Sequence, residues 1–353
     1  MYKKFFMGIA AMAAMTLVSC SSDDLNSLSD NSSKNEAISF DGYWGRSAVA
    51  VNGSRGSVLD KTTLQSAGFG VFGNYSFTES ENANFGTNLF NNVKVTGTTS
   101  KGSTTWSYDG VKYWPSQGHI DFLAYAPHET GKTLKNTSCI DFTVESKAAE
   151  QKDLLWANAK NQTTTTIAST GNKVKFQFKH ALSRLGFTVK LKGKPSTDVT
   201  ITLKSIKLAG SATESTPEAF YTSGAIDLAA GSWDKTTLNN KQNLDWFSSS
   251  QKVTSTSQSN IDFNTDYLFV IPQDFSETAT DKLYVIVEYD IKYNDISETL
   301  TNKVHQQIKE KFEQGKAYMI NLTIGRPIEF NAEVTPWTGE GNSETGIDID
   351  SWE

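Results

Sequence analysis

Apolar and polar residues alternate at a two-residue period through much of this chain. Apolar side chains take every second position over residues 174–178, 187–191, 283–291 and 318–324, and the positions between them are mostly polar. Because successive side chains of a β-strand point to opposite faces, this period predicts strands with one buried and one solvated face. Many short strands without strand–helix alternation predict antiparallel sandwiches rather than a doubly wound parallel sheet.

Helical signals are few and short. Residues 146–157 and 303–312 are the two stretches in which we expect a short helix. A Gly-Arg-Pro break at residues 325–327 separates strand-period runs over 318–324 and 328–334, so we expect two strands there. The predicted fold class is all-β, with two tandem antiparallel β-sandwich domains and few short helices.

The length of the chain predicts more than one domain. Without its first 19 residues the chain still has 334 residues, which is long for one compact sandwich. Residues 158–172 are mostly polar and separate two strand-rich regions. We therefore expect an N-terminal sandwich over residues 38–165 and a C-terminal sandwich over residues 166–353.

The N-terminus carries the pattern of a lipoprotein signal peptide over residues 1–19. Two lysines precede an uncharged apolar stretch, residues 5–18, that is too short to span a bilayer as a helix. The sequence Leu-Val-Ser then precedes Cys20 and matches a lipobox, whose thiol becomes linked to diacylglycerol. Residues 20–37 are rich in Ser, Asn and Asp, so we expect a disordered tether. An ordinary signal peptide with an incidental Cys20 is the alternative.

Few residues suggest chemistry. The net charge of −6 and the lack of a basic run argue against a nucleic-acid partner. Besides Cys20 the chain has only Cys139, so we expect no internal disulfide. The four histidines have no metal-ligand spacing, and no HExxH or CxxC motif occurs. We expect no metal, no cofactor and no enzymatic activity.

Two weak patterns are better explained as structure. Gly68, Gly70 and Gly73 form a GxGxxG, but they lie inside a strand-like run, so we expect a glycine-rich strand with a bulge rather than a dinucleotide site. His180 and Ser183 are three residues apart without an evident acid partner, and we expect a packing or hydrogen-bonding histidine there.

Six loose motifs follow one another along nearly the whole chain after the signal peptide. In this order and combination they resemble those of the Bacteroidetes fimbrillins, the subunits of type V pili. The motifs are Ile38-Ser39-Phe40 with Arg46-Ser47-Ala48, Phe69-Gly70-Val71-Phe72, Tyr113-Trp114-Pro115 with residues 120–127, residues 153–157, residues 180–185, and residues 321–324 with residues 334–338.

The resemblance implies two transthyretin-like sandwiches and assembly by strand exchange. An Arg-specific protease is expected to cut between Arg46 and Ser47, with Arg55 as the reserve site. The cut removes a strand that contains Ile38 and Phe40, and a strand of the next subunit fills the opened groove by main-chain pairing. The expected donor residues are Ile347, Ile349 and Trp352 at the C-terminus.

The leading hypothesis is a structural stalk or tip subunit of a cell-surface fimbria that supports adhesion. Its expected partners are other pilus subunits, the Arg-specific protease and, in the precursor, the outer membrane through the lipid on Cys20. Residues 21–24 resemble the acidic signal that sends Bacteroidetes lipoproteins to the cell surface. An anchor subunit that keeps its lipid is left open.

The alternative is a lipid-anchored surface glycan-binding protein. It would present an exposed planar cluster of Trp106, Trp233 or Trp246 beside a cleft. A hydrolase, a third hypothesis, would need an acid pair of perturbed pKa in a pocket.

Overall fold

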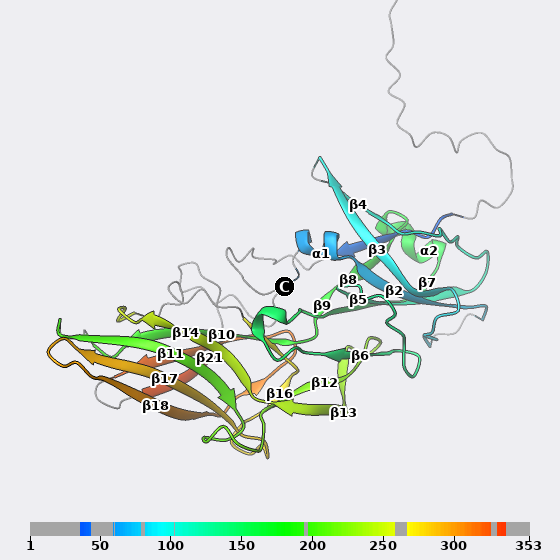
Figure 1. The fold of residues 1–353 in the computed structure, drawn as a ribbon. Helices are drawn as coiled ribbons and strands as arrows, with labels where there is room; N and C mark the ends of the chain where they lie inside the picture. Colours follow the sequence, from blue (N-terminus) through cyan, green and yellow to red (C-terminus); the bar gives the residue numbers. More distant parts are fainter. Residues whose placement is uncertain are drawn as a thin grey trace, which may run out of the picture. The chain divides into compact units, whose positions relative to one another are not determined.

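The computed structural model describes residues 36–43, 59, 61–78, 82–101, 103–193, 197–257, 267–325 and 330–336. β-Strands predominate in these ranges (Figure 1), which confirms the prediction of an all-β chain with few short helices. The helical segments described are α1 (Lys61–Ala67), η2 (Ala148–Glu150), α2 (Thr164–Ile167) and η3 (Ala168–Thr170). None of the described helices has the length and apolar character needed to cross a membrane.

Six strands form an N-terminal sheet in the order β4-β3-β2-β5-β7-β9, and all neighbours are antiparallel. Their bounds are β2 (Phe69–Ser76), β3 (Phe90–Ser100), β4 (Ser103–Ser107), β5 (His119–Ala126), β7 (Leu155–Gln162) and β9 (Lys179–His180). A separate two-stranded sheet pairs β1 (Phe40–Tyr43) in parallel with β8 (Val174–Gln177).

The β1–β8 pair packs with the six-stranded sheet in one apolar cluster, which we call the N-terminal core. Strand β5 shows how the sheet is buried on both faces. Ile120, Phe122 and Ala124 belong to the N-terminal core, whereas Leu123 and Tyr125 belong to another cluster, the junction cluster described below. Because both faces are covered, the end of β5, from Phe122 to Ala126, is a continuous apolar run rather than an alternation.

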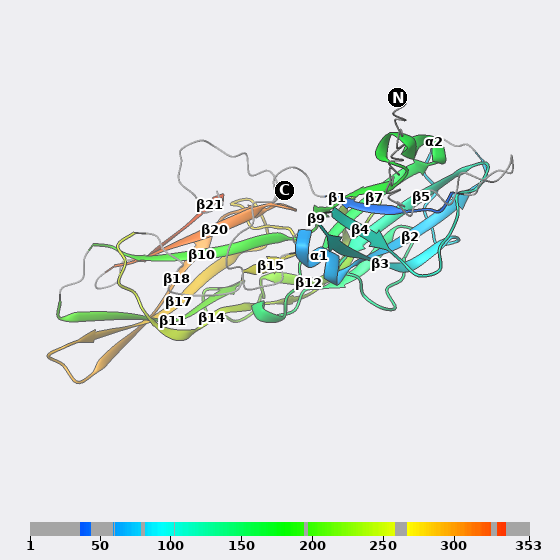
Figure 2. The ribbon, with the colours of Figure 1, turned by 90° about the horizontal axis from the view of Figure 1, so that it is seen from above.

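Two four-stranded sheets enclose another apolar cluster, which we call the C-terminal core. One has the order β15-β10-β20-β21 and the other the order β14-β11-β17-β18. Figure 2 shows β10 and β20 side by side, and this pair is parallel. The strand bounds are β10 (Ser183–Leu191), β11 (Val199–Ala209), β14 (Leu244–Lys252), β15 (Leu268–Val270), β17 (Leu283–Tyr293), β18 (Thr299–Ile308), β20 (Ala317–Ile324) and β21 (Phe330–Pro336).

The C-terminal core contains alternate residues of the strands that surround it. From β17, every second residue between Leu283 and Ile291 enters the cluster, as does every second residue between Leu185 and Leu191 in β10. The two sheets therefore face each other as a sandwich, as the two-residue period predicts. Strands β20 and β21 are separate, which confirms the expected break between them.

A third apolar cluster, which we call the junction cluster, contains residues of the N-terminal sheet and residues from later in the chain. It contains Phe72 and Leu123 of the N-terminal sheet together with Ile226 and Phe269 from later in the chain. Strand β6 (Cys139–Thr143) pairs with β12 (Phe220–Asp227), which pairs with β13 (Ser232–Gln242). A small sheet of β16 (Gln273–Asp274) and β19 (Lys311–Phe312) completes the described strands.

Both expected helices are wrong. Within residues 146–157 only the single turn η2 is helical, and β7 begins at Leu155. Leu155 and Ala157 enter the N-terminal core while Leu154 enters the junction cluster, so burial on both faces gave an apolar run without strand period. Within residues 303–312, β18 pairs with β17 residue by residue up to Ile308.

The expected change of domain near residue 166 stays a prediction. Ile167, Phe176 and Phe178 pack in the N-terminal core, and from Leu185 onward the alternating side chains of β10 pack in the C-terminal core. Between Phe178 and Leu185 the chain passes through the junction cluster with Ala181 and Leu182.

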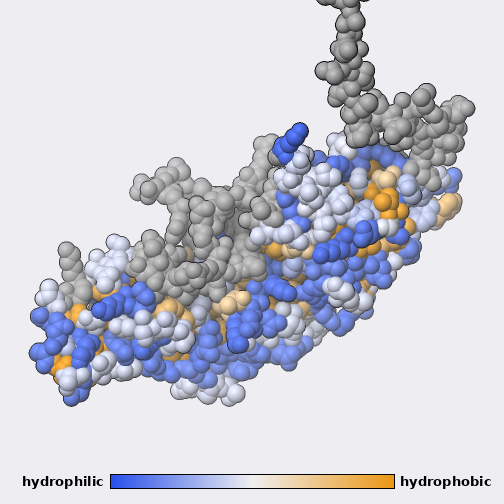
Figure 3. All heavy atoms as spheres, turned by 45° about the horizontal axis from the view of Figure 1, so that its top comes forward, coloured by the Kyte–Doolittle hydropathy of each residue, from blue (hydrophilic) through white to orange (hydrophobic). Residues whose placement is uncertain are grey.

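Figure 3 shows that hydrophilic residues predominate on the face drawn, where hydrophobic residues form small separate groups.

Candidate functional site

Ile38 and Phe40, the residues of the expected excised strand, are buried in the N-terminal core with 1% and 2% of their surface exposed. The Phe40 ring lies edge-on to Phe90 and Phe122, with ring centroids 5.5 Å apart in both pairs, and stacks on Phe176 at 5.6 Å. Full burial of one such side chain stabilises a fold by about 1.5–3 kcal/mol. Phe40 is therefore a central packing residue of this core.

The main chain around β1 is hydrogen-bonded on both sides. Strand β1 pairs with β8 from Phe40 opposite Val174 to Tyr43 opposite Gln177. On the other side, Ile38 N–H donates to the Lys112 carbonyl at 2.8 Å and Trp114 N–H donates to the Glu36 carbonyl at 2.9 Å. We call the surroundings of residues 36–43, formed by β8, residues 108–114 and the N-terminal core, the β1 site.

Tyr108 holds the β1 site from the side. Its hydroxyl donates to the Ile38 carbonyl at 2.7 Å, and its ring lies 5.4 Å from that of Phe40. Burial raises the pKa of Tyr108, and the hydrogen bond from the Lys112 backbone lowers it less. The hydroxyl is thus protonated at neutral pH and remains a donor.

Gly42 marks a position of the β1 site with little space. A Cβ at Gly42 would lie 3.1 Å from Cζ2 of Trp106 and 3.5 Å from Cε1 of Phe69. The Trp106 ring is itself fixed against Phe69, with centroids 5.1 Å apart. A strand in this site therefore needs large apolar residues at positions 38 and 40 and a very small residue at position 42.

Leu59, downstream of β1, is held by contacts that do not involve β1. Leu59 is buried in the N-terminal core, and its N–H donates to Oδ2 of Asp153 at 3.3 Å. The same carboxylate oxygen lies 2.8 Å from Nδ1 of His180. Arg184 is also buried here; burial lowers its pKa to about 10, and Tyr267 and Asp153 oppose that shift. These contacts do not include residues 36–43.

Two motifs that carry the family resemblance meet at this point. Ala181 N–H donates to the Leu154 carbonyl at 2.7 Å, and His180 pairs with Leu155 between β9 and β7. Ser183 is fully buried, and its hydroxyl donates to the Glu313 carbonyl at 2.7 Å. His180 thus lies in the N-terminal sheet, and Ser183, three residues later, is bonded to the chain segment that precedes β20. The expected packing or hydrogen-bonding role of His180 stays a prediction.

The glycine motif also has a structural role. Gly70 and Gly73 lie within β2, and the pairing of β2 with β3 shifts register between Val71 and Gly73, which confirms the glycine-rich strand with a bulge. At Gly70 a Cβ would lie 2.4 Å from the Tyr125 ring. The glycine therefore allows that ring to approach the strand closely.

The three tryptophans of the glycan-binding alternative do not form an exposed cluster. Trp246 is 5% exposed in the C-terminal core. Trp233 donates its indole N–H to the Ala181 carbonyl at 2.7 Å and packs against the junction cluster. Trp106 covers Gly42 and Phe69 in the β1 site.

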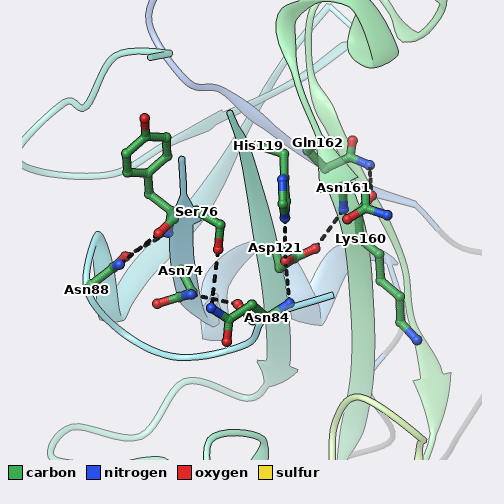
Figure 4. A network of polar contacts seen from close by, with 10 residues as sticks. Asn74, Ser76, Asn84, Asn88, His119, Asp121, Lys160, Asn161 and Gln162 are labelled. Atoms are coloured by element: carbon green, nitrogen blue, oxygen red, sulfur yellow. Dashed lines mark hydrogen bonds and ion pairs between the residues drawn. The ribbon is translucent and has the colours of Figure 1, made fainter. Parts of the chain in front are cut away.

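A buried polar network around Asp121 connects β5 with β7 and with the loop that contains Asn84 (Figure 4). The Asp121 carboxylate accepts hydrogen bonds from Asn84 N–H and Asn161 N–H, both at 2.7 Å, and lies 3.2 Å from Nε2 of His119. Asn84 in turn donates to Ser76. Both oxygens of the carboxylate accept N–H groups, so the network is structural. Among the described residues no group of three His, Cys, Asp or Glu side chains could hold a metal ion.

The structure describes only part of the expected site. Ile38 and Phe40 lie together in one core, as the alternation predicts. The other expected site residues lie outside the described residues: Cys20, Arg46, Ser47, Arg55, Ile347, Ile349 and Trp352. The sequence alone does not indicate the partners of the strand, Lys112, Trp114 and Trp106. Gly42 follows Phe40 at the same two-residue period, and a glycine inside a strand indicates that another part of the chain approaches the strand closely.

Comparison with known proteins places the chain in a family. A family model described as fimbrillin-like matches residues 58–337. A fimbrial protein from Bacteroides vulgatus has 22% sequence identity and a TM-score of 0.66, with 86% of this chain and 100% of that chain covered. A Bacteroides uniformis protein whose name proposes a role in cell adhesion has 18% identity and a TM-score of 0.51, with coverage of 86% and 99%.

These two structures share the fold of this chain, whereas no curated protein matches its sequence. Because the family model spans most of the sequence, from before α1 to just past β21, the chain belongs to the fimbrillin-like family.

Proposed function

We propose that this chain is a structural subunit, stalk or tip, of a cell-surface fimbria that supports adhesion. It is exported as a lipoprotein through Cys20 and assembles by strand exchange after an Arg-specific protease cuts at Arg46. Family membership and the fold shared with the Bacteroides vulgatus fimbrial protein support the fimbrial assignment. The single observation that carries strand exchange is the seating of Ile38 and Phe40 in the N-terminal core.

The composition of the chain supports cleavage at Arg46 or Arg55. Only four of its 33 basic residues are arginines: Arg46, Arg55, Arg184 and Arg326. Arg184 is only 7% exposed, and Arg326 precedes a proline, which disfavours cleavage. An Arg-specific protease therefore has two suitable sites, and both lie between β1 and α1.

One cut there frees β1 and leaves the chain from Leu59 onward in place. The described contacts of residues 36–43 with β8, residues 112–114 and the N-terminal core are all non-covalent. While the chain is intact, its covalent connection keeps β1 at an effective concentration in the millimolar range for a short linker. After the cut the fragment dissociates by dilution, and the Leu59–Asp153 contact still holds the downstream chain.

The vacated β1 site then needs a new strand. Loss of β1 removes the packing partner of Phe90, Phe122 and Phe176, and exposes the unpaired edge of β8. A donor strand from another copy restores both the packing and the main-chain pairing. Because the donor and the acceptor are different surfaces, the contact does not close and a filament results.

In this proposal the lipid on Cys20 attaches only the precursor to the outer membrane. Cleavage at Arg46 removes residues 20–46 together with the lipid, and the subunit leaves the outer membrane for the fimbria. A subunit that escapes cleavage keeps Cys20 and remains an anchor. The glycan-binding alternative has no support from Trp106, Trp233 or Trp246, whose rings pack in the fold.

Digestion of the purified precursor with an Arg-specific protease tests this function. The expected result is conversion of the monomer into a ladder of SDS-resistant species, because each vacated β1 site accepts a strand from another copy. Electrophoresis without heating and size-exclusion chromatography measure the conversion.

The matched control replaces Arg46 and Arg55 with lysine. These substitutions keep the charge and remove the cleavage sites, so the double variant is expected to stay monomeric under the same digestion. A wild-type protein that is cut after Arg46 yet stays monomeric at high concentration contradicts the stalk assignment.

A further inference from the structure

The loop between β11 and β12, residues 210–219, has a fixed base, and we call this loop the strap. Oδ1 of Asn243 accepts the N–H groups at both ends of the strap, from Gly210 at 3.0 Å and from Ala219 at 3.2 Å. The amide of the same side chain donates to the carbonyl of Glu214, in the middle of the strap, at 3.3 Å. Asn243 therefore holds the two ends of the strap together.

The Glu214 carboxylate fastens the middle of the strap to the sheet β14-β11-β17-β18. Its Oε2 accepts a hydrogen bond from Nζ of Lys207 in β11 at 2.9 Å, and its Oε1 forms an ion pair with Lys303 in β18. Strand β17 lies between β11 and β18, and Figure 1 shows the three strands side by side. Because one carboxylate binds a lysine on either side of β17, the strap crosses this strand.

Ile286 is covered on the outer face of β17. The residues before and after it, Val285 and Val287, pack in the C-terminal core, so the side chain of Ile286 points to the opposite face of the sheet. It is nevertheless only 2% exposed. Its neighbours in register are Lys207 of β11 and His305 of β18. Since Lys207 also binds the strap, the strap crosses the sheet at Ile286 and covers it.

Charge holds the strap in a strained conformation. Glu214 has a φ of 59°, in the left-handed region that residues other than glycine rarely adopt, and such backbone persists only where its surroundings hold it. The hydrogen bond from Lys303, followed by that from Lys207, keeps the pKa of Glu214 below its ordinary value, although burial opposes this shift. Hydrogen bonds to Glu214 and Asp245 raise the pKa of Lys207. At neutral pH charge-assisted bonds therefore close the strap.

We propose that the strap is a conformational device, closed over Ile286 by the Glu214 carboxylate and opened at its middle when that carboxylate is protonated, while Asn243 keeps its base in place. The open strap exposes Ile286 beside Tyr284, another residue on the outer face of β17. This face then offers an apolar contact area that the closed strap covers. None of these residues belongs to the β1 site, so the proposal does not depend on strand exchange.

Acid is the condition that opens the strap. Because the pKa of Glu214 in the closed strap lies below the ordinary 4.5, its ion pairs stabilise closure fully above pH 4.5 and lose this effect as the pH falls through the lowered pKa. The other titratable groups that face this carboxylate are Lys207, Asp245, Tyr284, Glu288, Lys303 and His305. Protonation of Asp245, Glu288 or His305 makes the surroundings more positive and favours the Glu214 carboxylate. Only protonation of Glu214 itself therefore opens the strap.

The reactivity of a thiol at position 286 tests the proposal. In the full-length protein with Cys20→Ser and Cys139→Ser, Ile286→Cys places a thiol beneath the strap. Its rate of reaction with dipyridyl disulfide, which modifies thiols at neutral and acidic pH, is compared with the rate in the urea-unfolded protein at the same pH. We expect a slow reaction at neutral pH and a relative rate about tenfold higher well below pH 4.5, because the loss of a charge-assisted hydrogen bond shifts a local opening equilibrium by about that factor.

Glu214→Gln imitates the protonated carboxyl at every pH. In this variant we expect the relative rate at position 286 to be about tenfold higher already at neutral pH and to change little in acid. The matched control is Glu277→Gln, whose carboxylate pairs with Lys309 but is 72% exposed, and we expect no change from it. Val287→Cys reports on the core face of the same strand and is expected to stay unreactive throughout.

Three results overturn the proposal. The first is a relative rate at position 286 that is the same at neutral pH with Glu214→Gln as without it, and the second is an acid transition that persists in Glu214→Gln. The third is simultaneous reaction of Val287→Cys, which shows that the sheet unfolds and that the strap does not open by itself. His305→Asn is expected to keep the acid transition, and loss of the transition in this variant assigns the opening to His305 instead.

Discussion

Phe40→Ala is expected to lower the free energy of unfolding of the uncleaved precursor by about 3–5 kcal/mol, the usual cost of removing a buried phenylalanine ring. Phe40 is 2% exposed and contacts the rings of Phe90, Phe122 and Phe176, so its removal leaves a cavity in the N-terminal core. Once Arg46 is cut and a donor strand has replaced β1, residue 40 is no longer in the subunit. The assembled fimbria is therefore expected to be as stable as the wild type.

Two measurements separate these states. Urea denaturation of the precursor gives the loss before cleavage, and the temperature at which SDS dissociates the ladder gives the stability after assembly. The control is Phe176→Ala, which lies in β8 and remains in the subunit. It is expected to destabilise both states. A ladder of Phe40→Ala that dissociates as early as that of Phe176→Ala shows that β1 has stayed in place.

Asp153→Ala is expected to destabilise the precursor and the assembled subunit alike, by about 3–5 kcal/mol, which is the cost of removing one partner from a buried charged contact. Asp153 is fully buried, accepts the Leu59 N–H and lies 2.8 Å from His180. Buried Arg184 lies near enough for the Asp153 charge to raise its pKa against the effect of burial. All four residues lie downstream of Arg46, so cleavage does not remove them.

Denaturation of both states measures this effect, and hydrogen exchange at the Leu59 amide reports the local contact. The matched control is Asp141→Ala, whose side chain is 57% exposed, and we expect a much smaller change from it. If Asp153→Ala unfolds like the wild type and Leu59 exchanges no faster, the carboxylate does not hold the downstream chain.

The sequence predicted the strands whose burial is one-sided. Strands β10 and β17 lie where their two-residue period predicts, because every second residue packs in the C-terminal core and most of the residues between them are only partly buried. The period fails where a sheet is covered on both faces. Around Leu154–Leu155 neighbouring side chains enter different clusters, and the resulting apolar run lacks the strand period and resembles a helical pattern.

The candidate site was predictable only in part for a related reason. Ile38 and Phe40 show the strand by local alternation, whereas their partners are distant in sequence. Residues 108–114 come about 70 positions later in the chain, and β8 more than 130. No local pattern links such segments, and only the folded chain shows that Trp106 limits the space at Gly42.

The N-terminus of subunits isolated from surface fimbriae tests strand exchange most directly. Mass spectrometry of the intact subunits gives the first residue, the last residue and any lipid in one measurement. The expected subunit begins at Ser47, or at Gly56 if Arg55 is cut, and carries no lipid. Fimbrial subunits that begin at a lipidated Cys20 and still contain Ile38 and Phe40 contradict assembly by exchange of β1.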